Sequence, residues 1–169
     1  GGLVGVLLLA VFAGVLFVPG FHYGLADKDP GGYVAHAMGI ARTGNYEFKD
    51  PAVGKIPDLQ YISPGARFNG FWVSSAKPGW IVPQFYHLWP ALMAVSYEAF
   101  GERGLAETAP LCALLAALAV ALALRRAVSA SVLAERRPAL PLAAGLAAGT
   151  LLVSNMMEVW QAKTPSSEA

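Results

Sequence analysis

The chain has 169 residues, of which 56% are hydrophobic and only 14% are charged, and its formal net charge is +1. Soluble domains carry about 25% charged residues, so this composition is not that of a typical soluble domain. The sequence has no basic stripe for nucleic acid, and its single cysteine, Cys112, excludes an intrachain disulfide framework.

Three segments without any charged residue have the length of a membrane-spanning helix, namely residues 3–18, 108–124 and 138–157. Spanning a bilayer takes roughly 17–25 mostly apolar residues. Glycines within such segments are tolerated, because lipid offers the backbone no competing hydrogen-bond partner. The expected fold is therefore an all-α membrane protein with three transmembrane helices, the first within 1–19 and the others at 108–124 and 138–157.

The first apolar segment has a second interpretation, as a cleaved signal peptide. Such a peptide begins with a basic region, whereas this chain has neither an initiating Met nor any Lys or Arg before Lys28. These observations favour a transmembrane helix inside a longer protein, of which the chain would be the N-terminal portion.

The arginine-rich link 125–137 predicts the topology. It carries four arginines against one acid, Glu135, whereas segment 20–104 balances seven basic residues with seven acidic ones. Short loops with excess Lys and Arg stay in the cytoplasm, so we expect the link to be a cytoplasmic loop. The long loop 20–107 and the start of a second loop, 158–169, then share the outer face of the membrane.

Residues 83–100 are apolar enough to suggest a fourth span, although they include His87, Pro90 and Glu98. A full crossing would place the arginine-rich link outside, against the charge rule. We therefore expect a juxtamembrane helix that lies at, or dips into, the outer interface. Four aromatic residues suit that depth, namely Tyr86, Trp89, Tyr97 and Phe100.

A second juxtamembrane helix is expected at about 30–43. Asp29 is a favoured N-cap, and Pro30 at the first helical position loses no hydrogen bond. An apolar stripe follows at helical spacing, made of Tyr33, Val34, Ala37, Met38 and Ala41. The remainder of the loop, 45–80, reads as irregular, with one hairpin signal, Asn69-Gly70, in an aromatic stretch that fits a binding loop.

Asp29 is the first candidate for chemistry. A carboxylate at a helix N-terminus is held as the anion by the helix dipole and the backbone N–H groups. Asp29 can therefore be a plain cap, a catalytic group or both, whereas Asp27 reads as a solvated loop acid.

Glu168 and Lys163 follow the third apolar segment and would share the outer face with Asp29. Two carboxylates and a cation suit a reaction on a lipid-linked phosphate ester, in which one acid is the general base and cations or a metal hold the leaving phosphate. The structural alternatives are an exposed acid for Glu168, a snorkelling cation for Lys163 and a packing residue for His87.

Several motifs occur in a familiar order. DPGGYVAHA at 29–37 and ARTG at 41–44 follow the N-terminal apolar segment. PQFYHLWPAL at 83–92 precedes an Ala/Leu-rich helix that ends in Arg-Arg, and a further helix leads to WQAKTPSSE at 160–168. This order resembles the N-terminal part of the GT-C superfamily of membrane glycosyltransferases, in the branch of the protein O-mannosyltransferases and the aminoarabinose transferase of lipid A.

The resemblance implies a polyprenyl-phosphate-sugar donor and transfer, on the outer (periplasmic) face, to a lipid, glycan or protein acceptor. Asp29 matches the first acid of the family's outer-loop motif, with Tyr33 four residues on, whereas Pro30 replaces the second acid. Glu168 is the candidate for the acid of the second outer loop. His87 lies near the position where the aminoarabinose enzymes carry Lys-Pro-Pro or His-Pro-Pro.

The expected function is an inverting membrane glycosyltransferase of a bacterial inner membrane. Asp29 would deprotonate the acceptor hydroxyl. Lys163, with Arg67 or His87, would stabilise the departing phosphate. Glu168 would position the acceptor. Whether Asp29 and Glu168 hold a divalent metal (Mg or Mn) stays open. The alternatives are a non-catalytic transporter or scaffold subunit and a degenerate transferase fold that only binds lipid.

Overall fold

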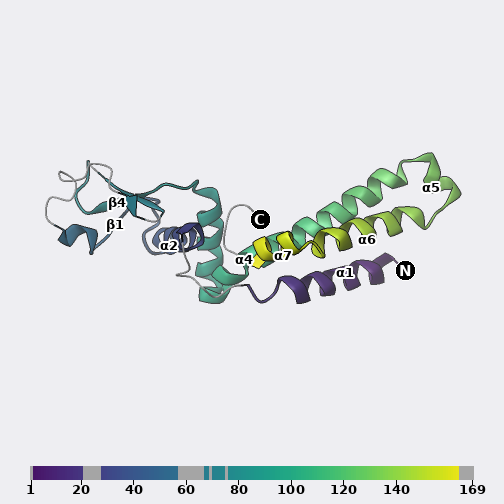
Figure 1. The fold of residues 1–169 in the computed structure, drawn as a ribbon, viewed down its shortest axis with the longest axis horizontal. Coiled ribbons are helices and arrows are strands. Elements are labelled where there is room, and N and C mark those ends of the chain that lie inside the picture. The colour runs from purple at the N-terminus through teal and green to yellow at the C-terminus, as the bar shows by residue number, and fades with distance from the viewer. Residues whose placement is uncertain (1, 21–27, 57–66, 69, 75, 164–169) are drawn as a thin grey trace. The chain divides into compact units, whose positions relative to one another are not determined.

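The computed structural model describes residues 2–20, 28–56, 67–68, 70–74 and 76–163, and these belong to two compact units. The helical unit contains residues 2–20 and 109–163, and the mixed unit contains the described residues from 28 to 108. About 73% of the described residues are helical (Figure 1).

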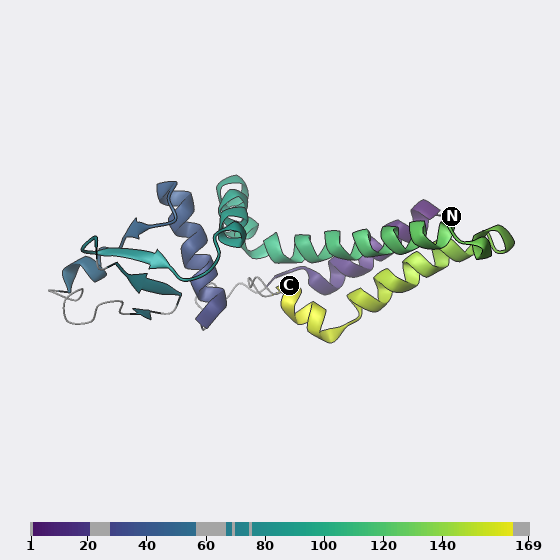
Figure 2. The same cartoon turned by 90° about the horizontal axis from the view of Figure 1, so that it is seen from above.

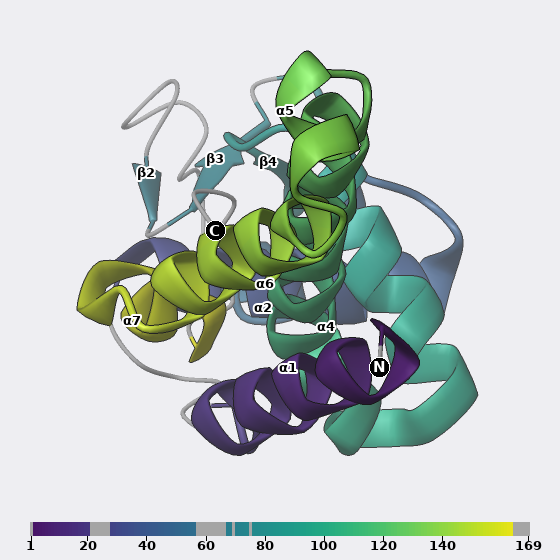
Figure 3. The same ribbon diagram turned by 90° about the vertical axis from the view of Figure 1, so that its right-hand side faces the viewer.

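The helical unit is built from apolar helices that run alongside one another (Figures 2 and 3). Its elements are α1 (Gly2–Phe17), the C-terminal part of α4 (Leu88–Ser129), α5 (Val132–Arg136), α6 (Leu140–Val153) and α7 (Met156–Lys163). Small side chains fill its core. In the C-terminal part of α4, buried alanines recur every four residues along one helix face, namely Ala109, Ala113, Ala117 and Ala121.

Two glycines four residues apart, Gly145 and Gly149, place α6 against its neighbours. A Cβ atom added at Gly145 would lie 2.5 Å from the carbonyl oxygen of Ala121 in α4, and one added at Gly149 would lie 2.5 Å from a methyl group of Leu9 in α1. Close backbone approach through Gly-x-x-x-Gly is typical of helices that associate in membranes, where small residues allow dense packing.

The outer faces of these helices are as apolar as their inner ones. In α1 the exposed fractions are 74% for Leu3 and 71% for Val15, while Ala13 and Phe17 are fully buried. A helix that is apolar all round is normally surrounded by protein or by lipid.

By length and composition, one described helix, α4, could cross a membrane, and only 17% of its most apolar window is buried. Helices α6 and α7 are long and apolar enough to cross a membrane only when they are taken together, and this pair is bent by 65°. Helix α1 is apolar but shorter, with 16 residues. The fold therefore includes one long apolar helix that could span a membrane, and the three spans that the sequence predicts are not confirmed.

The break between α6 and α7 lies inside the expected span 138–157. The side-chain oxygen of Asn155 accepts hydrogen bonds from the backbone N–H groups of Met157 (2.9 Å) and Glu158 (3.4 Å). Asn155 therefore caps a new helix, α7, instead of continuing α6.

The mixed unit combines α2 (Lys28–Thr43) and the first part of α4 with a small sheet. Apolar side chains of the two helices form its main core, namely Tyr33, Val34, Ala37, Met93, Ala94 and Leu105. Helix α4 is interrupted at Gly101, where φ is +65° and ψ is −149°, a conformation available almost only to glycine. This break ends the first part of α4 at the C-terminal end of the juxtamembrane helix that the sequence predicts at 83–100.

Four short strands make an antiparallel sheet in the order β1-β4-β3-β2. They are β1 (Phe48–Lys49), β2 (Arg67–Phe68), β3 (Phe71–Val73) and β4 (Trp80–Pro83), and the 3-10 helix η1 (Val53–Lys55) adds Val53 to their apolar core. The Asn-Gly hairpin signal is confirmed, since Phe68 pairs with Phe71 across a two-residue turn. Gly70 in that turn has φ +81°, as such turns require.

The sheet corrects two expectations. The fold is mostly helical rather than all-α, and residues 45–80 are not wholly irregular, because strands β1 to β3 lie within them. These strands are two to four residues long, too short to show a period-two pattern. Strand β1 pairs with β4, which is about thirty residues away, and local sequence signals do not predict such a long-range pairing.

Several helix boundaries also differ from the prediction. Helix α2 begins at Lys28, so Asp29 lies within its first turn and is not the N-cap; Pro30 is compatible because the first-turn N–H groups have no intrahelical acceptor. The helix predicted from residue 83 begins at Leu88, because residues 80–83 belong to β4. The predicted loop 125–137 is largely helical, since α4 continues to Ser129 and α5 follows.

Candidate functional site

The structure describes some of the predicted site residues and not others. Tyr33 and His87 belong to the mixed unit, and Lys163, which is partly buried, ends α7 in the helical unit. Glu168 and the side chains of Asp29 and Arg67 lie outside the described part of the structure.

Tyr33 lies in the contact between α2 and the segment that leads from β4 into α4. Its side chain is 6% exposed, and its ring packs against that of Phe85 with centroids 4.5 Å apart. Position 29 is one helical turn before Tyr33, so the two positions lie on the same face of α2.

His87 is held between two aromatic side chains. The His36 ring from α2 meets it edge-on with centroids 5.4 Å apart, and the Tyr46 ring lies tilted over it at 4.8 Å. His87 itself is exposed to solvent, and Tyr46 is 49% exposed. The three side chains, which we call the histidine cluster, therefore present one accessible imidazole whose ring is packed from two sides.

His36 is the unusual member of the histidine cluster. Its side chain is fully buried, and neither ring nitrogen has a hydrogen-bond partner within the described residues. Burial, and secondarily the charge of a protonated His87, lower the pKa of His36 from 6.5 to about 4. At neutral pH the buried ring is therefore uncharged, and His87 is the imidazole of the pair that contacts solvent.

An ion pair fixes the chain beside Tyr46. Lys77 Nζ donates a hydrogen bond to Glu47 Oε2 at 2.7 Å and lies 5.0 Å from the centre of the Trp80 ring. The hydrogen bond from Lys77 lowers the pKa of Glu47. The contact joins the segment before β1 to the turn between β3 and β4, and so supports the position of Tyr46 over His87.

The described residues contain no group of three or more His, Cys, Asp or Glu side chains that could hold a metal ion. The two carboxylates proposed from the sequence as metal ligands, Asp29 and Glu168, are not among the side chains described. Whether these acids hold a metal stays a prediction.

Sequence reasoning missed two members of the histidine cluster, His36 and Tyr46. His36 has a signal in the sequence, because it lies three residues after Tyr33 and hence near it on one face of the predicted helix. Tyr46 has none, since its contact with His87 joins positions 41 residues apart.

Comparisons with known proteins add no family assignment. No protein-family model matches the sequence, and neither a curated protein nor a solved structure matches it.

Proposed function

We propose that the chain is part of a membrane glycosyltransferase, which moves a sugar from a polyprenyl-phosphate donor to an acceptor hydroxyl with inversion at the anomeric carbon. In this proposal the apolar segments at 1–19, 108–124 and 138–157 cross a bacterial inner membrane, and the mixed unit lies on its outer face. Two things support the proposal. One is the resemblance of the sequence to the GT-C superfamily, and the other is the arrangement of the described residues.

The observation that carries the proposal is the histidine cluster, which packs on the helix, α2, whose first turn contains Asp29. The accessible imidazole of His87 is packed against α2, and Asp29 belongs to the first turn of the same helix. A candidate base and a candidate phosphate-binding group thus belong to one compact unit, although they are 58 residues apart in the sequence. A transporter would be expected to place its acidic groups near the middle of the spans instead.

The packing of the helical unit supports the membrane location. Its helices meet through alanines and glycines and leave large apolar side chains exposed, for example Leu115 (65%) and Leu151 (74%). In water such a surface would aggregate, whereas in lipid it is the normal outer face of a helix bundle.

The proposed step is a single displacement. The Asp29 carboxylate accepts the proton of the acceptor hydroxyl, and the resulting oxygen attacks the anomeric carbon of the donor. The bond from that carbon to the phosphate oxygen breaks, and the polyprenyl phosphate leaves with the electron pair. His87, together with Lys163 or Arg67, would stabilise the charge on the leaving phosphate, and Glu168 would position the acceptor or a metal.

The test is sugar transfer from a labelled polyprenyl-phospho-sugar by membranes that contain the full-length protein. Asp29→Asn should lower the rate of transfer by about 10²–10⁴-fold, the usual contribution of a general base. Asp27→Asn is the matched control, because it removes the same charge two residues away, and it should retain the wild-type rate.

Full activity of the Asp29→Asn variant would overturn the assignment of the base. If the wild-type protein transferred none of a panel of sugars, the proposed activity would be wrong, and a transporter, scaffold or lipid-binding protein would be favoured. The same assay in EDTA tests the metal, since loss of transfer that Mg²⁺ or Mn²⁺ restores would assign a divalent ion to the reaction.

A further inference from the structure

Four arginines gather at the end of the helical unit where α4, α5 and α6 are joined. Arg125 and Arg126 lie in the last turns of α4, Arg136 ends α5, and Arg137 follows it (Figure 1). All four are exposed, and none forms an ion pair within the described residues. We call this set the arginine end.

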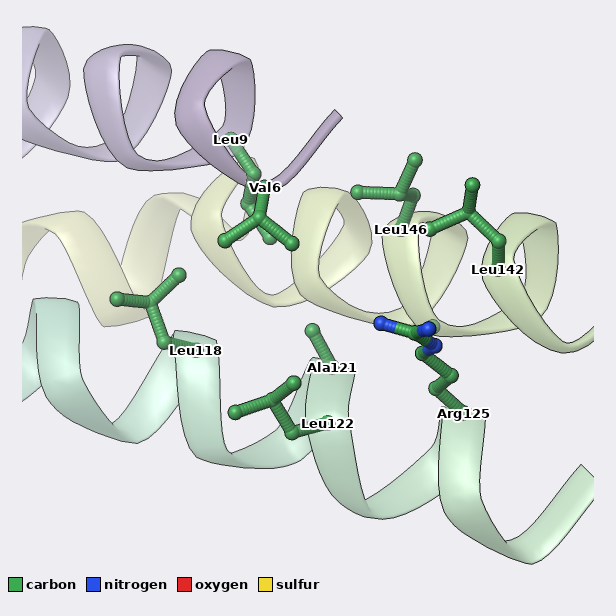
Figure 4. A pocket seen from close by; sticks show the side chains of 9 residues that line it. Val6, Leu9, Leu118, Ala121, Leu122, Arg125, Leu142 and Leu146 are labelled. Carbon is green, nitrogen blue, oxygen red and sulfur yellow. The ribbon is translucent and has the colours of Figure 1, made fainter. Parts of the chain in front are cut away.

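Arg125 differs from the other three because its side chain lines an apolar crevice between α1, α4 and α6. Figure 4 shows it extending from α4 toward α6, near Leu142 and Leu146. The absent side chain of Gly145 makes this approach possible, since a Cβ atom there would lie 3.0 Å from the Cβ of Arg125. The arginine stem thus packs on apolar side chains while its guanidinium group remains accessible, the snorkelling arrangement of interfacial cations.

Exposed apolar side chains accompany the arginines. The exposed fractions are 46% for Leu122, 69% for Val132 and 61% for Leu133. A nucleic acid or an acidic protein surface would satisfy the cations and leave these side chains in water. A ligand that satisfies both kinds of group must carry a negative head beside a hydrocarbon chain.

We propose that the arginine end binds the headgroup of an anionic phospholipid, with the acyl chains along the exposed apolar side chains. Guanidinium groups bind phosphate oxygens through paired N–H donors, and basic sites between membrane helices are known to favour anionic lipids. The site rests on the membrane location given under the proposed function, but not on glycosyl transfer. It involves none of the residues proposed for that reaction.

The test measures lipid binding by the full-length protein in detergent micelles. Native mass spectrometry would give dissociation constants for dioleoylphosphatidylglycerol and dioleoylphosphatidylcholine. The wild-type protein should prefer phosphatidylglycerol. The double variant Arg125→Ala/Arg126→Ala should bind it about 25-fold more weakly, since each arginine near an anionic lipid contributes about fivefold.

A second double variant, Arg136→Ala/Arg137→Ala, removes cations that make no packing contact with the crevice, so it keeps the test valid if the first variant folds poorly. Arg42→Ala/Arg103→Ala is the charge-matched control from the mixed unit and should bind as the wild type does. Inorganic phosphate at 10-fold excess over the lipid should not compete, because it lacks the hydrocarbon part.

Equal affinity of the wild-type protein for both lipids would overturn the proposal. So would an equal loss of affinity in the control and in both arginine-end variants, and so would displacement of the lipid by inorganic phosphate. Lipid binding is measured without any sugar donor, so these outcomes are independent of whether the protein is a glycosyltransferase.

Discussion

His36 shows how one residue can link acidity to the stability of the mixed unit. A buried imidazole without a hydrogen-bond partner costs free energy, and its charged form costs more. The neutral ring is tolerated because it packs edge-on against His87. A proton on His36 would place a positive charge at a fully buried position.

The free energy of unfolding should therefore depend on pH through His36. The pKa is 6.5 in the unfolded chain and about 4 in the folded one, so the unfolded state binds the proton first as pH falls. Stability should be complete above pH 6.5 and should decrease between pH 6.5 and 4, by on the order of 3 kcal/mol in total. Urea unfolding followed by tryptophan fluorescence between pH 4 and 7.5 measures this change.

His36→Leu supplies the comparison, because leucine fills the site without titrating. This variant should lose the His36 part of the pH dependence while retaining the part that arises from carboxylates such as Glu47. If the free energy of unfolding depended on pH equally in the wild-type protein and in His36→Leu, the assignment of this dependence to His36 would be wrong.

At the residue scale, motifs in the sequence singled out two residues that the structure describes in the mixed unit, and their roles stay predictions. Tyr33 and His87 follow from the resemblance to the GT-C superfamily, and the structure places both in the contact between α2 and the start of α4. The contact of Tyr46 with His87 could not be predicted from the sequence, because only folding brings the two residues together. Arg125 was assigned by charge alone, and its contact with an apolar crevice follows from the packing of α6 at Gly145.

At the scale of elements, Gly145 controls the distance between α4 and α6. The atom that an added Cβ would meet is the backbone carbonyl oxygen of Ala121, which cannot rotate away as a side chain can. Gly145→Ala should therefore force the helices apart and destabilise the helical unit by about 1–3 kcal/mol. Thermal unfolding in detergent micelles, followed by circular dichroism, measures the effect.

Gly14→Ala is the matched control for Gly145→Ala. It makes the same substitution in an apolar helix, α1, but nothing lies within 4 Å of the added Cβ. Alanine favours the helical conformation over glycine by up to about 1 kcal/mol, so this variant should be as stable as the wild type or slightly more stable. Equal destabilisation by both substitutions would show that helix propensity, not packing, governs the response.

The elements that sequence reasoning located are those with a strong local signal. The apolar runs predicted the helices of the helical unit, and Asn69-Gly70 predicted the hairpin between β2 and β3. The break between α6 and α7 was missed because Ser154 and Asn155 are uncharged and were counted within one apolar run. Gly145-x-x-x-Gly149 was visible in the sequence, and it is a known packing signal for membrane helices.

At the scale of the whole molecule, the distribution of basic residues makes a prediction about topology. Single cysteines placed at Phe68 and Ser131 in a Cys112→Ser background should lie on opposite sides of the membrane. A membrane-impermeant maleimide should label the first from outside, and the second only after the membrane is opened. The cysteine-free background should not be labelled, and labelling of both sites from one side would overturn the topology.

The Asn155 cap also has a consequence for the bilayer itself. It ends α6 after 14 residues, which is about 21 Å of helix at 1.5 Å per residue. A typical hydrocarbon core is about 30 Å thick, so α6 is too short to match it. A bilayer around this helix would have to become thinner locally, and this hydrophobic mismatch would favour membranes that are thin or easily compressed.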